Sequence, residues 1–158
     1  MATIYLAGGL FNAGERLHNL FLEKFLQELG HMIILPQREA LKFFDKNGHL
    51  NLDAVAGDCR RYCEDERVIY VGNIDGADAD SGTGVEYGIA ITVAGAAIVY
   101  RTDFRTDAEK EIGVNAMLKL KGTTFIYHPC FFTELGDEVR NYYRELAKKI
   151  DEAVRALE

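Results

Sequence analysis

The feature of this chain that most constrains its fold is a regular alternation of short apolar runs with longer amphipathic segments. Short apolar runs bounded by glycine, proline or polar residues are typical of buried strands. Five such runs are present, at Thr3–Ala7, 31–35, Val68–Val71, Ala96–Tyr100 and Thr123–Tyr127. Strands that alternate with helices form a parallel sheet with both faces covered, because each crossover places a helix on one face.

Five strands of this kind predict an α/β fold with a flavodoxin-like (Rossmann-like) arrangement and the strand order 2-1-3-4-5. Residues 1–158 are expected to form a single domain, since the length suffices for one core and no linker or repeat interrupts the chain. Ligands bind such sheets at the carboxyl ends of the strands. The first three strand ends would therefore bring Tyr5–Gly9, Gln37 and residues 75–88 towards one crevice.

The segments between the strands carry helix signals. Asn12-x-x-Glu15 resembles a capping box, so a first helix is expected from there to Leu29, with an apolar stripe at Leu17, Phe21, Phe25 and Leu29. Further helices are expected at Leu52–Cys63, Thr83–Ala94 and 115–120. The last helix carries a stripe that would face the core or a partner: Val139, Tyr143, Leu146, Ile150, Ala153 and Leu157. Residues 37–50 are expected to be irregular, and 101–113 to be a charged loop.

The composition excludes several classes of function. A net charge of −7 argues against a nucleic-acid partner, because phosphate-backbone binding depends on basic patches. No apolar run approaches the ~20 residues of a membrane span, and the N-terminus reads as a strand, not as a signal peptide. Cys59, Cys63 and Cys130 suit a reducing compartment, so a cytoplasmic protein is expected. The four-ligand spacings of structural zinc are absent, and neither a metal nor a cofactor is expected.

Residues 75–88 indicate the chemistry, with the sequence Asp-Gly-Ala-Asp-Ala-Asp-Ser-Gly-Thr-Gly-Val-Glu-Tyr-Gly between a predicted strand and a predicted helix. Glu86 would lie near the helix N-terminus, where the positive field is expected to keep it ionised. Asp80 lies upstream on the loop. An ionised carboxylate with a second carboxyl beside it can cleave and re-form a glycosidic bond.

Other interpretations of the same stretch remain open. Thr83-x-x-Glu86 also fits a capping box, in which the glutamate only satisfies a backbone amide. The three aspartates resemble part of a calcium loop, although Asp80 stands where an EF-hand requires glycine. The glycines lack the third member of a dinucleotide fingerprint, and no phosphate loop, zinc-protease motif or serine-hydrolase motif is present.

Several segments, in a fixed order, match one known pattern. They are Ile4-Tyr5-Leu6-Ala7-Gly8, Phe11-Asn12, Leu35-Pro36-Gln37, Asp58, Asp80-x-Gly82-Thr83-x-x-Glu86-x-Gly88-x-Ala90 and Asn115-Ala116-Met117-Leu118. With these segments the chain resembles the nucleoside 2-deoxyribosyltransferase family. The family implies a double displacement at the anomeric carbon of a 2′-deoxynucleoside, with free nucleobases as the exchange partners and nucleotide salvage as the setting.

By this resemblance, Glu86 is the nucleophile that forms a deoxyribosyl ester, and Tyr5 is the hydroxyl that positions it. Asp80 holds a sugar hydroxyl or assists protonation of the departing base. Asp58 orients the sugar and the base, and Gln37 contacts the edge of the base.

The resemblance also implies that Asn115 is lent to the site of a neighbouring subunit, so a homo-oligomer with shared active sites is expected. Gly8, Phe11 and Gly82 complete the expected substrate-binding residues. The chain departs from the family at Gly9, where many relatives carry proline. It also lacks a clear match to the C-terminal tyrosine or carboxylate of the family.

Two further functions stay open. One is an N-glycoside hydrolase acting on 2′-deoxynucleosides or their 5′-monophosphates, and the other is a non-catalytic nucleoside-sensing module. The segment Gly8–Asn12 offers little to hold a phosphate except Arg16, which favours nucleosides over nucleotides.

Overall fold

The computed structural model describes residues 1–105 and 113–158. Its described part contains a fully parallel sheet with the strand order β2-β1-β3-β4-β5, which confirms the predicted α/β flavodoxin-like class and order. The strands are β1 (Thr3–Ala7), β2 (Met32–Ile34), β3 (Val68–Asn73), β4 (Ala97–Arg101) and β5 (Thr123–Tyr127).

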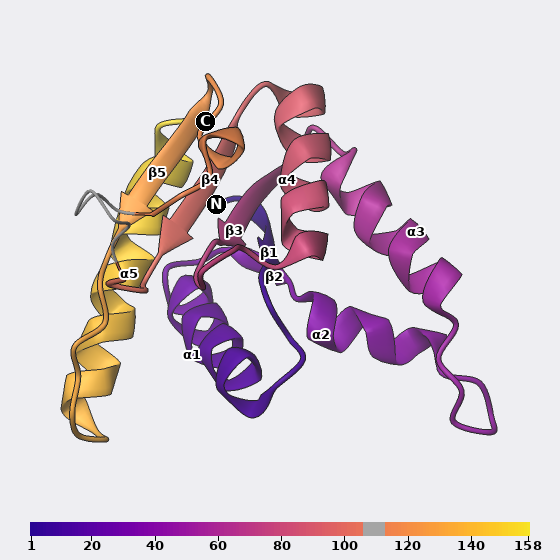
Figure 1. Cartoon of the computed structure of the whole chain (residues 1–158), viewed down its shortest axis with the longest axis horizontal. Coiled ribbons are helices and arrows are strands. Elements are labelled where there is room, and N and C mark those ends of the chain that lie inside the picture. Colours follow the sequence, from indigo (N-terminus) through magenta and orange to yellow (C-terminus); the bar gives the residue numbers. More distant parts are fainter. Residues whose placement is uncertain (106–112) are drawn as a thin grey trace.

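Helices cover both faces of the sheet (Figure 1). On one face lie α1 (Ala13–Glu28) and α5 (Asp137–Arg155), and on the other lie α3 (Leu52–Cys63) and α4 (Ser81–Ala94). Three short elements complete the described chain: α2 (Pro36–Glu39) and the 3₁₀ turns η1 (Ala40–Phe43) and η2 (Ala116–Leu118). Among these helices, none combines the length and the apolar character that crossing a bilayer requires.

The sheet separates two hydrophobic clusters because successive side chains of a strand point to opposite faces. Ile4 and Leu6 of β1 join the cluster under α1 and α5. Tyr5 and Ala7, which alternate with them, join the cluster under α3 and α4. The order of residues in β1 therefore decides that the Tyr5 hydroxyl lies on the face covered by α4.

The capping box of α1 is confirmed: the Asn12 side chain accepts from the Glu15 N–H at 3.1 Å, and the Glu15 carboxylate accepts from the Asn12 N–H at 3.3 Å. The predicted stripe of this helix is right only in part: Phe25 is buried and Phe21 is partly buried against the core, but Leu17 and Leu29 are exposed. A strict four-residue spacing advances by about 40° per step on a helix with 3.6 residues per turn, so such a stripe wraps around the surface. The buried face is instead Asn19, Leu22, Glu23, Phe25 and Leu26.

The expectation of an irregular segment at 37–50 is wrong over its first part, where α2 and η1 form. Pro36 opens α2 at a position where its missing N–H costs nothing, and the Leu35 carbonyl accepts from the Arg38 N–H at 2.8 Å. The stripe of α5 is buried in the core from Val139 to Ala153, so it faces the sheet and not a partner. Residues 106–112 of the predicted charged loop lie outside the described residues.

Candidate active site

The centre of the site is a contact between β1 and α4. The Tyr5 hydroxyl donates to Oε1 of Glu86 at 2.9 Å, although the two residues are 81 positions apart in the sequence. Tyr5 is fully buried and its ring stacks against Tyr62 of α3 and Tyr70 of β3. Packing on both sides leaves the hydroxyl little freedom, so it holds one oxygen of the Glu86 carboxylate in place.

Burial dominates the electrostatics of Glu86. Loss of water raises the pKa of Glu86 above its usual range, and the Asp80 charge raises it further. The hydrogen bond from Tyr5 and the neighbouring Cys59 thiol lower the pKa of Glu86 but do not offset the burial. The expected control by the helix N-terminus is wrong, because Glu86 lies in the second turn of α4, where the field has weakened.

Asp80 is the N-cap of α4, and α4 begins at Ser81 instead of the expected Thr83. Its Oδ2 accepts from the Thr83 N–H at 2.9 Å and from the Thr83 hydroxyl at 3.1 Å. A capping box starting at Thr83 is therefore wrong, because Thr83 is already inside the helix. Both contacts use one oxygen of Asp80, so its carboxylate is held rigidly with the second oxygen turned away from the cap.

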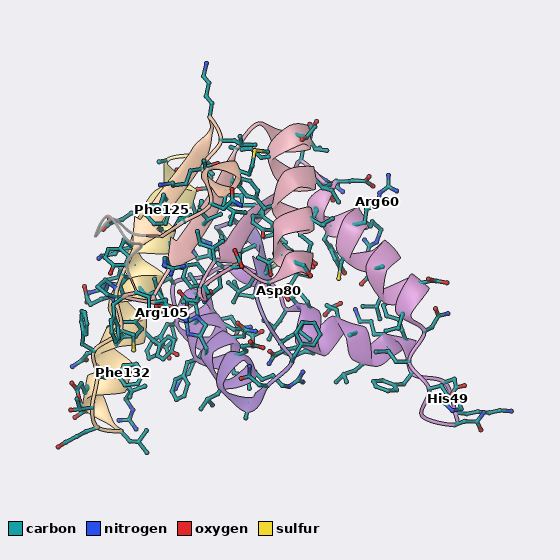
Figure 2. All side chains as sticks on the ribbon, viewed as in Figure 1. His49, Arg60, Asp80, Arg105, Phe125 and Phe132 are labelled. Carbon is teal, nitrogen blue, oxygen red and sulfur yellow. The ribbon has the colours of Figure 1, made fainter. Side chains whose placement is uncertain are left out.

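Figure 2 shows Asp80 at the start of α4, while Arg60 lies along α3 and His49 lies at the tip of a distant turn. Asp80 lines a crevice of about 400 Å³ at the carboxyl edge of the sheet. The other residues of this crevice are mostly polar or small: Gly9, Gly14, Glu15, His18, Asn19, Asn73, Asp75, Gly76 and Asp78. The crevice lies where parallel sheets bind their ligands.

Asp58 and Gln37 are engaged with protein groups. Asp58 of α3 is mostly buried and accepts from Arg61 at 2.5 Å. Gln37 is buried, its carbonyl oxygen accepts from Asn19 at 3.1 Å, and its amide donates to the Arg16 carbonyl at 3.2 Å. Each polar atom of Gln37 makes one of these bonds, and the substrate roles of both residues stay predictions.

The remaining predicted substrate-binding residues lie near the strand ends and at the start of α4. They are Gly8, Phe11 and Gly82. At Gly8 an added Cβ would approach the Cβ of Asn73 to 3.1 Å, so the first loop passes tightly over β3. Phe11 is exposed on that loop, and its N–H donates to Glu15 at 2.8 Å. Gly82 lies in the first turn of α4, where a Cβ would stand 3.2 Å from Oδ2 of Asp80. Their contacts with a substrate stay predictions.

Asn115 lies apart from the Tyr5–Glu86 pair. It caps η2 by accepting from the Met117 N–H at 3.0 Å, and its side chain is exposed. It lines a second pocket, of about 300 Å³, which Asp80 also borders. Within one chain, Asn115 thus comes near Asp80 but forms no part of the pair around Glu86.

Asn19 is a site residue that the sequence reasoning missed. Its side-chain amide donates to the Gly9 carbonyl at 3.0 Å and to Gln37 at 3.1 Å, which joins the first loop to α2. The available signal was an asparagine beside the apolar run Leu20-Phe21-Leu22, since a polar residue on the buried side of a helix needs partners. Cys59, whose burial raises its pKa and which lies beside Tyr5 and Glu86, carried no comparable signal.

Comparison with known proteins decides the family. The model of the nucleoside 2-deoxyribosyltransferase family matches residues 4–117, a span that includes Tyr5, Asp80 and Glu86. The chain belongs to this family. Among curated proteins, no sequence matches it significantly.

Two solved structures share the fold of this family member. A conserved protein from Enterococcus faecalis V583 is 20% identical, with a TM-score of 0.66 over 97% of this chain and 99% of that protein. A 2-deoxyribosyltransferase from the psychrotolerant bacterium Bacillus psychrosaccharolyticus is 22% identical, with a TM-score of 0.59 over 92% of this chain and 96% of that enzyme. At these identities the likeness establishes the architecture only.

A metal centre finds no support in residues 1–105 and 113–158, which contain no cluster of histidine, cysteine or acidic side chains placed to hold an ion. Cys63 is buried, and burial raises the pKa of its thiol, so the thiolate that a metal needs is disfavoured. Two rigidly held carboxylates and a phenol are what the site offers, and these groups suit chemistry at a sugar carbon.

Proposed function

We propose that the protein transfers a 2-deoxyribosyl group between nucleobases, with Glu86 as the nucleophile. The observation that carries this proposal is the 2.9 Å hydrogen bond between Tyr5 and Glu86, two residues at matching positions of the family pattern. A carboxylate that reacts at an anomeric carbon must be fixed within reach of it, and a buried phenol supplies that restraint. A glutamate with only a capping role would need no partner from β1.

The proposed reaction has two displacements. In the first, an oxygen of the Glu86 carboxylate forms a bond to the anomeric carbon while the carbon–nitrogen bond to the base breaks. The base leaves with a proton gained at a ring nitrogen. In the second, a nitrogen of an incoming base attacks the same carbon, the ester bond breaks, and the proton of that nitrogen is released. Glu86 returns to its starting charge, as a retaining mechanism requires.

Asp80 has the second role in the proposal. One of its oxygens accepts hydrogen bonds from Thr83. The other is proposed to accept a hydrogen bond from a sugar hydroxyl or to take part in the proton transfer at the base. Asp80 is the N-cap of α4 and Glu86 lies in the second turn of the same helix, and the Asp80 charge contributes to the raised pKa of Glu86. Glu15, Asp78 and Asp80 border the crevice and would repel a phosphate, so unphosphorylated 2′-deoxynucleosides are the proposed substrates.

The deciding experiment is incubation with deoxyinosine and free adenine, followed by chromatography for deoxyadenosine and hypoxanthine. Formation of both products is expected. Hypoxanthine with free deoxyribose and no deoxyadenosine would replace the proposal by hydrolysis. Binding without any product would replace it by a sensing role. A parallel incubation with inosine tests the sugar, and a slower exchange than with deoxyinosine is expected.

We also propose a homo-oligomer in which Asn115 completes the site of a neighbouring subunit. Asn115 is exposed and does not reach Glu86 of its own chain, while Val85 and Met117 expose apolar surface on α4 and η2. Two-fold assembly would make such a surface self-complementary. Mixing inactive Glu86→Ala with inactive Asn115→Ala should restore part of the activity, because some mixed sites hold both groups. A fully active monomer in sedimentation, or no rescue on mixing, would contradict this assembly.

A further inference from the structure

The turn that follows β3 is tied to the end of β4 through Asp75. Oδ1 of Asp75 accepts from the backbone N–H groups of Thr102 at 2.5 Å and of Asp103 at 2.8 Å. Oδ2 accepts from the Thr102 hydroxyl at 2.5 Å and from the Asn73 amide at 3.1 Å. Both oxygens are fully used by protein donors, so Asp75 serves the shape of the turn and has no lone pair aimed at a ligand.

Arg101 ties the same turn from the other side. Its guanidinium is almost completely buried, and Nη1 donates to the carbonyls of Ile74 at 2.8 Å and Gly76 at 3.0 Å. The Gly76 N–H donates to Oδ2 of Asp103 at 3.2 Å. A buried guanidinium that donates to backbone carbonyls fixes them firmly, because leaving such a charge without partners costs several kcal/mol.

Gly76 adds a conformational restraint to this turn. It adopts a φ of +103°, and an added Cβ would stand 2.8 Å from the Asp78 carbonyl oxygen. The chain therefore leaves the tied segment in one direction and reaches Asp80 after Ala77, Asp78 and Ala79. The turn at Gly76 is fixed at one end and α4 is fixed at the other. The short connection between them restricts the position of Asp80.

We infer that Asp75 and Arg101 are positioning residues that set the place of Asp80, the carboxylate at the start of α4. The inference rests on the proposed function for its kinetic consequence, because it assumes that Asp80 holds the sugar or the proton. The loop clamp consists of Asp75, Arg101, Thr102 and Asp103. A carboxylate that binds substrate from a loop needs such support, since misplacement by about 1 Å can cost about a hundredfold in rate.

The clamp also accounts for the crowded aspartates of residues 75–88. Asp75 faces donors of β4, and Asp80 faces the first turn of α4, so the two carboxylates point into separate sets of N–H groups. The repulsion that their spacing in the sequence suggests is offset by these donors.

The test is a double-mutant cycle with Asp75→Asn, Asp80→Asn and the double variant, measured as kcat/KM for base exchange. Asparagine at position 75 places an amide donor opposite the Asn73 donor, so the turn loosens. A fall of about a hundredfold is expected for Asp75→Asn in the otherwise native chain. In the Asp80→Asn background the same change should have an effect of about twofold or less, because the group being positioned is already disabled.

The matched control is Asp65→Asn. Asp65 also holds a turn beside β3, accepting from the Arg67 N–H at 3.0 Å, but at the amino end of the strand and away from the crevice. Its loss should leave kcat/KM within about twofold of the native value. Additive effects in the cycle, or an equal loss from Asp65→Asn, would overturn the positioning role and leave only a general effect on stability.

A second readout does not depend on turnover. Amide hydrogen exchange of residues 75–84 should accelerate in Asp75→Asn and, to a smaller extent, in Thr102→Val, which removes only the hydroxyl donor. Unchanged exchange in both variants would overturn the clamp. If the native protein transfers no deoxyribosyl group between bases, the proposed function fails. The amide hydrogen-exchange rates, together with calorimetric binding of deoxyadenosine, still decide whether the clamp holds the turn.

Discussion

The two faces of this sheet are built from different kinds of side chain. The face under α1 and α5 is packed mainly with aliphatic residues such as Ile4, Leu6 and Leu146, all fully buried. The face under α3 and α4 buries hydroxyl and thiol groups, among them Tyr5 and Cys63, and places the Glu86 carboxylate against them. Both faces bury tyrosine hydroxyls, since Tyr100 and Tyr143 bond His18 of α1, whereas the face under α3 and α4 sets the Tyr5 phenol against the proposed nucleophile Glu86.

The difference shows where burial is used for stability and where it is used for chemistry. Aliphatic burial contributes free energy roughly in proportion to the area removed from water. Burying a carboxylate beside phenols costs free energy and raises its pKa, as it does for Glu86. The aliphatic packing under α1 and α5 therefore offsets the free-energy cost of burying Glu86. Changes to the aliphatic core under α1 and α5 should reduce stability, and changes to the Tyr5–Glu86 pair should reduce activity.

The largest effect is expected from Glu86→Ala. Base exchange should fall by about a thousandfold, which corresponds to ~4 kcal/mol of transition-state stabilisation. The melting temperature should stay the same or rise, because a buried carboxylate is removed. Steady-state kinetics and thermal unfolding check both parts, with the exposed Glu152→Gln as the control. Activity within a few-fold of the native protein would remove Glu86 from the mechanism.

Leu146→Ala should have the opposite character. The side chain is fully buried under the sheet, and its truncation leaves a cavity, so the free energy of unfolding should fall by about 2–5 kcal/mol. The kcat of the folded fraction should not change. Denaturant unfolding with kinetics at low temperature measures both, and Leu157→Ala, at an exposed position, is the control. A specific loss of kcat would show that the faces are coupled.

Tyr5→Phe should change the pH dependence of activity. The hydrogen bond from Tyr5 lowers the pKa of Glu86, so its removal raises that pKa, and the carboxylate becomes active only at higher pH. The acidic limb of kcat/KM should therefore move to higher pH, and the rate at neutral pH should fall by about tenfold to about a hundredfold, given about 1.5–3 kcal/mol for a hydrogen bond to a charged group. Tyr127→Phe is the control, and an unmoved acidic limb would refute the contact's role.

His18→Gln should change the pH dependence of stability on the other face. Burial lowers the pKa of His18 to about 4 from 6.5, against the opposing charge of Asp75, and its ring bonds Tyr143 and Tyr100 at 2.9 and 3.0 Å. The neutral form is the one that folds, so its stabilisation is complete above pH 6.5 and is lost as the pH falls towards 4.

The native protein should therefore lose about 1–2 kcal/mol more than His18→Gln between pH 7 and pH 5. Denaturant unfolding at the two pH values measures this difference. Other groups titrate equally in both proteins and cancel. Parallel curves of unfolding free energy against pH would show that His18 does not cause the acid sensitivity. A shift in the pH profile of activity would show that the two faces are coupled.

Much of the fold follows from local patterns. Each strand run is short and apolar, and Asn12 with Glu15 forms the predicted capping box, because these features depend on neighbours in the chain. The strand order follows from the alternation of strands and helices. The stripe of α1 was predicted only in part, since Asn19 and Glu23 join the buried face by gaining partners from α2 that no helical periodicity records.

The sequence by itself determined the strands, most of the helices and the family pattern, and it pointed to Glu86 and Asp80 as candidate site residues. Only the tertiary structure decided their environment. It placed the Tyr5 hydroxyl on Glu86. It also showed that Asp75, which resembled a calcium ligand in the sequence, links the ends of β3 and β4. The physical reason is that hydrogen bonding and desolvation depend on groups 27 to 81 positions away in the chain, and a linear pattern does not encode their distances.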